Sequence, residues 1–395
     1  MKRILIALLA VFAICSSTAA QVPDDLYYVI YGDYTSKLIK VSDGKCVFEC
    51  EGSPSIAIDK NHNVYTLDGY QNYTLYKNGE VYQKLPQKSD KQYYTSMVMT
   101  VVGNDVVVAG VESREFNDKG FESRMVGYVN GKLVYQTEWH RKSLKRDRFI
   151  GYRKIIYEGT PAVGTEAVTG FNAIEKGDGT GRYDTRSLVY SVEAVDYVDG
   201  NIYTTGWGER EYSETPVGYQ TQYMVRRCPR VWKNGKQIIQ QYENRTGAGY
   251  NIHVMRNGKS ILTSGHQRNH ICVWDGDKVI VSKDTDIDMV YTEAVIFNGM
   301  ADKTPLFTRM FLTSKKDILY MVNTAKSGNL EPVIVDGRDI IYVIAIGNDF
   351  YALSKNDKIY KYSSQNWMTG EFTMSTVASI HKPTRSIYRL LVAPR

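Results

Sequence analysis

Two short polar segments carry carboxylates that could do acid–base chemistry. Glu112 and Arg114 lie in one segment, and Glu209 and Arg210 lie in the corresponding segment of a related repeat. General acid–base catalysis and glycoside hydrolysis both need carboxylates that converge on one substrate. The same carboxylates could instead pair with the arginines beside them, as exposed charges commonly do. The sequence leaves both interpretations open.

Other segments offer weaker chemical signals. His266 and His270 precede Cys272 and have side chains of the metal-binding type, but no HExxH helix frames them. We therefore predict no metal site and no cofactor, and we retain both histidines as candidate binding residues. Segment 141–154 holds seven basic residues, Lys145 and Arg146 among them, against one acid. It could attract an anionic partner, or it could be solvated surface.

The connection Trp207–Thr221 is the longest polar segment of its kind in the chain. Long loops on a rigid scaffold are where binding and catalysis usually occur. We therefore predict binding residues here and in the related segments. The candidates are Trp207, Glu209, Arg210, Tyr212, Glu112, Arg114, His266, His270, Lys145 and Arg146.

The candidate segments are parts of a repeated structural unit. Asn-Gly or Asp-Gly turns follow apolar runs and precede short strands at Asp43-Gly44, Asn78-Gly79, Asn130-Gly131, Asn234-Gly235, Asp275-Gly276 and Asp336-Gly337. Such turns predict β-hairpins, because a type I′ turn needs positive φ at both central residues. A second tight turn recurs upstream in most units. Each unit therefore consists of four strands, A–turn–B–loop–C–turn–D, over roughly 35–60 residues.

One four-stranded meander per repeat describes the blade of a β-propeller, an all-β fold. We predict about seven blades, with six to eight allowed, because residues 139–189 and 339–377 do not divide cleanly. The first of these ranges is expected to be loop-rich or a degenerate blade. Ser386–Ala393 is a lone strand that would close the ring by pairing with the N-terminal blade and removing an exposed edge. A pair of β-sandwiches is the alternative, but it would not explain the repeat.

Units of the form "vY..G … vWkNGk" carry a family resemblance, as in IYTTG at 202–206 and VWKNGK at 231–236. They resemble the repeats of secreted bacterial β-propeller proteins, and the resemblance covers nearly all of the chain after residue 20. It implies a fold but no catalytic residue. The diagnostic repeats of better-known propellers, such as Gly-His…Trp-Asp, YWTD and the sialidase Asp-box, are absent.

The N-terminus predicts export. Residues 1–20 have a basic start, an apolar stretch and a small-residue cleavage site, which is the pattern of a signal peptide. Residues 21–395 are then expected to form a single propeller domain in the periplasm, at the cell surface or outside the cell. No later segment is long and apolar enough to span a membrane. The formal net charge of +6 is mild and does not indicate a nucleic-acid partner.

Four cysteines lie outside the predicted signal peptide: Cys46, Cys50, Cys228 and Cys272. An even number in an exported protein permits disulfides. Cys46 and Cys50 would lie too far apart to bond if both were on one straight strand. We expect buried, reduced thiols.

The repeat also predicts which side of the ring carries function. The A–B and C–D turns must emerge on one side, and the longer B–C and D–A connections on the other, the long-loop face. We expect a non-enzymatic binding or scaffold protein that recognises a glycan or an envelope protein through that face; 31 tyrosines suit strands and sugar stacking alike. The alternative is a carbohydrate-active hydrolase or lyase that uses Glu112 and Glu209. A structural subunit of an envelope assembly is a third possibility.

Overall fold

The computed structural model describes the chain in segments. They are residues 23–31, 35–52, 54–68, 73–86, 92–115, 121–141, 153–157, 190–217, 220–240, 247–254, 261–267, 270–284, 292–293, 300–301, 304–305, 310–311, 319–322, 330–333, 340–346, 349–354, 358–366, 371–379 and 387–392. Within them every regular element is a strand. No helix in these segments could cross a membrane.

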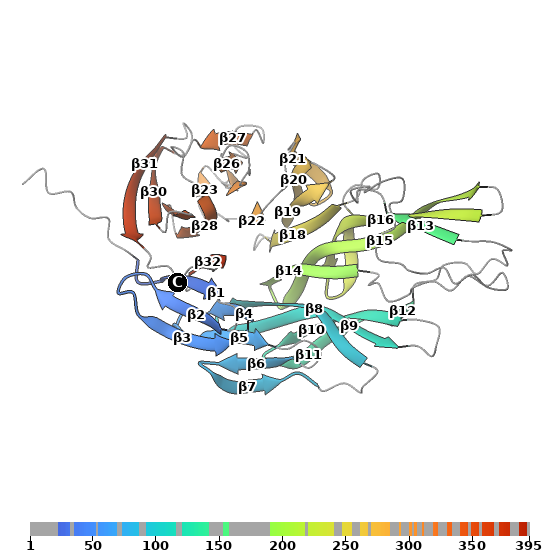
Figure 1. The fold of residues 1–395 in the computed structure, drawn as a ribbon, viewed down its shortest axis with the longest axis horizontal. Coiled ribbons are helices and arrows are strands. Elements are labelled where there is room, and N and C mark those ends of the chain that lie inside the picture. The colour runs from blue at the N-terminus through green and yellow to red at the C-terminus, as the bar shows by residue number, and fades with distance from the viewer. Residues whose placement is uncertain are drawn as a thin grey trace, which may run out of the picture.

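Six sheets of four or five strands are present in the described segments, and they form a ring (Figure 1). Blade 1 contains β32 (Ile387–Val392), β1 (Leu26–Tyr31), β2 (Thr35–Lys40) and β3 (Cys46–Glu51). Blade 2 contains β4 (Ser55–Ile58), β5 (Val64–Asp68), β6 (Thr74–Lys77) and β7 (Glu80–Lys84). Blade 3 contains β8 (Gln92–Val102), β9 (Asp105–Glu115), β10 (Phe121–Val129), β11 (Lys132–Gln136) and the short β12 (His140–Arg141).

The other three blades follow in chain order. Blade 4 contains β14 (Tyr190–Val198), β15 (Asn201–Val217), β16 (Gln220–Lys233), β17 (Lys236–Gln240) and β13 (Arg153–Tyr157). Blade 5 contains β18 (Gly247–Val254), β19 (Ile261–Gln267), β20 (His270–Asp275) and β21 (Lys278–Asp284). Blade 6 contains β28 (Ile340–Ile346), β29 (Asp349–Ser354), β30 (Lys358–Asn366) and β31 (Glu371–Ser379).

The protein is therefore an all-β propeller, as the repeat predicted, and its six blades fall within the range that the sequence allowed. Between blades 5 and 6 lie three two-stranded pieces. They are β22 (Thr292–Glu293) with β25 (Met310–Phe311), β23 (Met300–Ala301) with β24 (Thr304–Pro305), and β26 (Leu319–Val322) with β27 (Leu330–Val333). Of the ambiguous range 139–189, the described strands β12 and β13 join blades 3 and 4 and form no sheet of their own.

The C-terminal strand closes the ring, as predicted. β32 pairs antiparallel with β1 from Leu26 opposite Val392 to Tyr31 opposite Ile387. The first strand of each blade is also the innermost one, because these strands lie beside one another in neighbouring blades: β4 beside β8, β8 beside β14, β14 beside β18, and β28 beside β32. Figure 1 shows them around the axis, with the outer strands β3 and β7 at the rim.

The Asn-Gly turns have the predicted type I′ geometry and a second role that the pattern did not show. In blade 3, Asn130 and Gly131 have φ of 48° and 69°. The Asn130 side chain accepts a hydrogen bond from the Val106 backbone N–H at 2.9 Å and donates to Asp105 Oδ1 at 2.8 Å. In this blade the C–D turn is thus bound to the A–B turn beside it, so both lie on the same side of the ring. Asn78 and Asn234 make the same contacts in blades 2 and 4.

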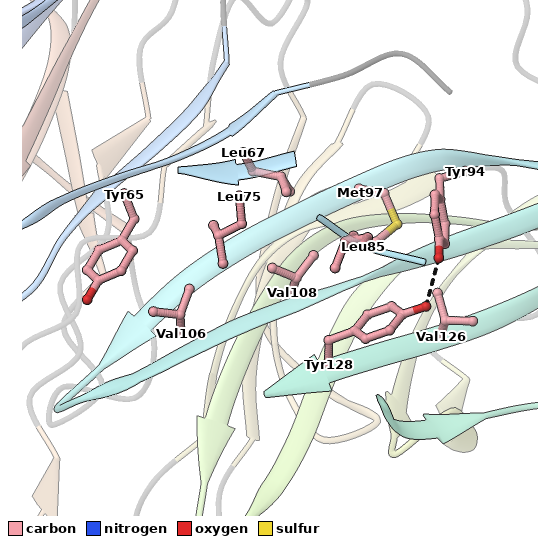
Figure 2. Packing of buried hydrophobic residues seen from close by; sticks show 10 residues of the cluster. All are labelled: Tyr65, Leu67, Leu75, Leu85, Tyr94, Met97, Val106, Val108, Val126 and Tyr128. Carbon is pink, nitrogen blue, oxygen red and sulfur yellow. Dashed lines mark hydrogen bonds between the residues drawn. The ribbon is translucent and has the colours of Figure 1, made fainter. Parts of the chain in front are cut away.

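Apolar side chains fill the space between adjacent blades. Figure 2 shows the cluster between blades 2 and 3, in which Leu75 lies near Val106 and Val108, and Val126 lies at the end near Tyr94. At one end of this cluster, the hydroxyls of Tyr94 and Tyr128 lie 2.8 Å apart and hydrogen-bond to each other. Tyrosines therefore contribute to the core itself as well as to half-exposed strand faces.

Two predicted loops are strands instead. Trp207–Thr221 continues the β15–β16 ladder as far as Val217 opposite Gln220, so it is the outer part of a long hairpin. Figure 1 shows this arm projecting beyond the ring, with β13 added parallel to β16. Val111–Ser123 likewise belongs mostly to β9 and β10. The prediction of loops was wrong here because polar composition was read as irregular structure, although cross-strand pairing also accommodates exposed polar side chains.

Candidate functional site

The sequence-predicted binding residues occupy several different places in the ring. Glu112 and Arg114 lie on β9 of blade 3, whereas Trp207, Glu209, Arg210 and Tyr212 lie along β15 of blade 4. His266 is near the end of β19 and His270 begins β20, so the two belong to one hairpin of blade 5. Lys145 and Arg146 lie outside the described residues. No three metal-binding side chains converge in the part of the chain that the structure describes.

Glu112 belongs to a square of four charges between β9 and β10. Glu112 lies opposite Arg124, and Arg114 lies opposite Glu122, so both pairs share one face of the hairpin. Arg124 Nε donates to Glu112 Oε2 at 2.9 Å, and Arg114 Nη2 donates to Glu122 Oε2 at 2.7 Å. The ring of Trp139 covers both guanidinium groups, at 4.1 Å from Arg114 and 4.5 Å from Arg124.

This charged square is built to hold the blade together. Glu112 has no exposed surface, and the Arg124 side chain is 17% exposed. A carboxylate that is buried and bound to a cross-strand arginine cannot reach a glycosidic bond without breaking that ion pair. The partner is Arg124 on the opposite strand, not the adjacent Arg114 that the sequence suggested. The square therefore fastens the Trp139 segment onto blade 3.

A second polar cluster lies on the innermost strands, where neighbouring blades meet. Strands β8, β14 and β18 each contain a β-bulge, between Thr95 and Val98, between Val192 and Ala194, and between Gly249 and Asn251. A bulge inserts one extra residue into a strand. Side chains then no longer alternate regularly between the two faces of the sheet, and the side chain at the bulge points in a new direction. The bulged residues include Ser96, Glu193 and Tyr250. Three consecutive blades therefore present a non-alternating polar residue near the axis.

The recurring glycine of the "vY..G" motif makes these bulges possible. Gly206 on β15 faces the bulge of β14, and a Cβ atom there would overlap the Ser191 carbonyl oxygen. Gly110 and Gly265 face the corresponding bulges of β8 and β18, again with a backbone carbonyl in the way of a Cβ. The motif thus marks the position at which an inner strand bulges.

Hydrogen bonds connect the bulges of blades 3 and 4. Ser96 adopts φ of 50°, a left-handed conformation that is uncommon outside glycine. Its Oγ donates to the Val192 carbonyl oxygen at 2.6 Å, accepts from the Val192 N–H at 2.9 Å, and lies 2.7 Å from Ser191 Oγ. Ser191 Oγ in turn donates to Glu193 Oε1 at 2.9 Å. A strained serine and its neighbour therefore fix one oxygen of an exposed carboxylate.

Tyr250 adds an aromatic ring to this cluster from blade 5. The neighbouring Gly249 lets β18 approach closely, since a Cβ there would overlap Thr205 of β15. Burial, and to a smaller extent the Glu193 carboxylate, raise the pKa of Tyr250 from 10 to about 12. Its phenol is therefore protonated throughout the physiological range and can donate a hydrogen bond.

We define the inner-strand site as Ser96, Ser191, Glu193 and Tyr250. It combines hydroxyl groups, an aromatic ring and an exposed carboxylate. The Glu193 carboxylate retains acceptor capacity beyond its bond to Ser191. The bulges lie in the earlier parts of their strands, nearer to the D–A connections and hence to the long-loop face. None of these four residues was predicted from the sequence, although the glycine of the "vY..G" motif marks the position opposite each bulge.

No protein-family model and no curated protein sequence matches the chain. Solved structures that resemble it include apo AztD from Citrobacter koseri, with 10% identity over 93% of this chain and 97% of that one and a TM-score of 0.43. Another is Sqt1 from Saccharomyces cerevisiae, with 10% identity over 94% and 93% and a TM-score of 0.45. A third is the WD40 β-propeller domain of Doa1, with 12% identity over 87% and 90% and a TM-score of 0.46. The propeller assignment rests on the strand order and ring closure described above, and these likenesses add no function.

Proposed function

We propose that this propeller is an exported, non-enzymatic binding protein that recognises a glycan at the inner-strand site, on the long-loop side of the ring axis. The observation that carries the proposal is the arrangement of Glu193, Tyr250 and the two serines on three adjacent inner strands. Sugars present hydroxyl groups that donate to carboxylates and accept from phenols, and apolar C–H faces that pack on aromatic rings. The exposed Glu193 carboxylate supplies an acceptor for such a ligand, and the Tyr250 ring lies near it.

Binding is favoured over hydrolysis by the state of the carboxylates. Glycosidases use two carboxyl groups about 5–9.5 Å apart, on either side of the scissile bond. Glu112, which the sequence singled out as one such group, is fully buried and bound to Arg124. The inner-strand site itself holds a single carboxylate, that of Glu193. A fixed carboxylate beside hydroxyl groups orients a sugar but does not by itself provide an acid and a base.

Export is part of the proposal and rests on the signal-like N-terminus. Fusing residues 1–20 to a reporter enzyme that is active only after export tests it directly. We expect activity, and a matched fusion in which Lys2 and Arg3 are replaced by Glu should lose it. A reporter that stays inactive with the natural segment would refute export without bearing on sugar binding.

Sugar binding is tested with the purified protein lacking residues 1–20. A glycan array at low salt should identify a ligand, and calorimetry should then measure its affinity. Glu193→Gln should weaken binding at least tenfold, because a hydrogen bond to a charged group contributes about 1.5–3 kcal/mol. Glu80→Gln, on the exposed outer strand β7, serves as the matched control and should bind like the wild type.

Two outcomes contradict the proposal in different ways. If no glycan binds at low salt, the function is wrong, and a protein partner becomes the next candidate. If a glycan binds and Glu193→Gln has no effect, the function stands but the site is elsewhere. Glu209→Gln distinguishes that case, because it alters the projecting arm of β15 and leaves the inner strands intact.

A further inference from the structure

The outer strand of blade 1 has an unpaired edge and a self-complementary sequence. In the described part of the chain, β3 pairs with β2 on one side, and no strand pairs with its other side. β3 lies at the outer rim of the ring (Figure 1). Its residues are exposed or half-buried, and Val47 is 45% exposed. An exposed edge of this kind presents backbone N–H and C=O groups to any strand that approaches it.

The sequence around Phe48 is self-complementary, because equivalent pairs of residues face each other when two copies of β3 run antiparallel. Val47 is a bulge in the pairing of β3 with β2, since Leu38 lies opposite Phe48 and Ile39 lies opposite Cys46. If the free edges of two copies of β3 pair antiparallel about a twofold axis at Phe48, counting along the chain sets Cys46 of one copy opposite Cys50 of the other. In the same register Lys45 lies opposite Glu51, which places opposite charges together at both ends. Cross-strand pairs of opposite charge stabilise antiparallel sheets. One register therefore aligns both the thiols and the charges.

We propose that this edge is a homodimer interface, in which two copies pair through β3 and are joined by two symmetric Cys46–Cys50 disulfides. Opposite residues of an antiparallel pair have Cα atoms about 4.5 or 5.5 Å apart. Both distances fall within the range of about 4.4–6.8 Å found for disulfides. The partner of the interface is thus a second copy of this chain.

Among the cysteines that the structure describes, none is a better partner for these two thiols. Cys46 and Cys50 are four residues apart on β3, which separates them by roughly 10–13 Å at about 3.3 Å per residue, the lower figure allowing for the bulge at Val47. No disulfide links the four described cysteines within the chain. Cys228 and Cys272 are buried, at 0% and 1% exposure, so neither is available at the surface.

The disulfides are needed because the strand contact is small. Pairing the six residues of β3 on each side buries much less than the roughly 1,200–2,000 Å² of a stable protein–protein interface. The reaction begins at the exposed Cys46, since burial raises the pKa of the Cys50 thiol to about 11. The Cys46 thiolate attacks an external disulfide, RSSR, and releases RS⁻. The Cys50 thiolate of the other copy then displaces the second RS⁻. Each bond thus converts two protein thiols and one RSSR into one protein disulfide and two RSH.

The experiment uses the protein lacking residues 1–20, with oxidised glutathione as RSSR, followed by non-reducing electrophoresis and mass-spectrometric mapping of the disulfide. The wild type should form a covalent dimer that contains a Cys46–Cys50 cross-link. Cys46→Ser alone and Cys50→Ser alone should each lose that dimer. An equal mixture of the two variants should regain it, because one copy still supplies Cys50 and the other Cys46.

The mixture of the two variants and the single variants together test the register of the interface. A dimer formed by Cys50→Ser alone would show a Cys46–Cys46 bond and overturn the register. A wild type that stays monomeric, or that forms a bond within one chain, would overturn the interface. Cys228→Ser is the matched control and should dimerise like the wild type.

The charge pairs provide an independent readout of the same register. Lys45→Glu and Glu51→Lys should each slow disulfide formation by roughly two- to fivefold, since cross-strand charge pairs are individually weak. The double variant, which exchanges the two charges, should restore the wild-type rate. Equal rates for all three variants would contradict the register.

Discussion

The charged square of blade 3 and the inner-strand site use similar side chains in opposite ways. In the square, Glu112 is fully buried and bound to Arg124, and the ring of Trp139 covers the arginines. At the inner-strand site, Glu193 is exposed on a bulge and bound to a serine hydroxyl that lies against a strained residue. The first arrangement uses its charges for stability, and the second leaves a carboxylate accessible to a ligand.

This difference shows why residue type alone did not separate structure from function. Both Glu112 and Glu193 lie in alternating, β-rich segments with serine neighbours. What separates them is the partner. An arginine on the opposite strand neutralises Glu112 inside a regular ladder, whereas a bulge takes Glu193 out of the alternation. The comparison can be tested by removing each charge in turn and measuring stability.

The largest expected effect comes from Glu112→Gln. The substitution leaves Arg124 mostly buried without a counter-charge, and breaking a buried ion pair costs about 3–5 kcal/mol of unfolding free energy. Urea unfolding followed by tryptophan fluorescence measures this loss. Glu122→Gln, in the more exposed half of the square, should cost less, about 1–3 kcal/mol. Equal and small losses would show that the square does not hold the blade.

A second variant separates charge loss from packing. Replacing Glu112 by Met and Arg124 by Leu together removes both charges and keeps side-chain volume. Such replacements of buried ion pairs by apolar residues are often neutral or stabilising. We therefore expect the double variant to be clearly more stable than Glu112→Gln.

The next effect concerns the turn clamp on the opposite side of the ring. Asn130→Gly keeps a residue that tolerates φ of 48° but removes the side-chain hydrogen bonds to Val106 and Asp105. We expect a loss of about 1–3 kcal/mol, because each net hydrogen bond contributes about 1 kcal/mol. Asn104→Gly, in the exposed A–B turn of the same blade, should cost less. If both variants lose the same amount, the clamp adds nothing beyond turn conformation.

The contacts that these variants remove could not be predicted from the sequence, whereas the turns could. The turns predicted the repeat and the propeller, because positive φ at Asn-Gly is a local requirement that the sequence must satisfy, and the lone strand at Ser386–Ala393 predicted ring closure. The clamp of Asn130 on Val106 joins residues 24 positions apart, and the Glu112–Arg124 pair depends on the register of β9 and β10. Both contacts depend on which strands pair and in which register, and neither follows from a local sequence pattern. The inner-strand site depends on bulges in the same way, and the recurring glycine of the motif was the one sequence signal that pointed to it.

At the inner-strand site, the third expected effect appears only at high pH. Tyr250 has a pKa near 12 in the folded protein, against about 10 in an unfolded chain. The unfolded state loses this proton first, so the stability contributed by Tyr250 is present below pH 10 and is lost between about pH 10 and 12. Tyr250→Phe should show a shallower fall of unfolding free energy over that interval. Parallel curves for the two proteins would place Tyr250 in solvent.

The smallest expected effect on stability is that of Glu193→Gln, in contrast to the large loss expected for Glu112→Gln. An exposed carboxylate with one serine donor contributes little, so unfolding free energy should change by less than about 0.5 kcal/mol. The same substitution should lower the pKa of Tyr250, because the neighbouring charge that disfavours the phenolate is gone. Burial, the larger cause, remains, so that pKa should stay above 10. Spectrophotometric titration of wild type and variant, with Tyr250→Phe to assign the signal, measures the shift. A variant that loses several kcal/mol of stability would make Glu193 a structural residue like Glu112, and the distinction between the two clusters would fail.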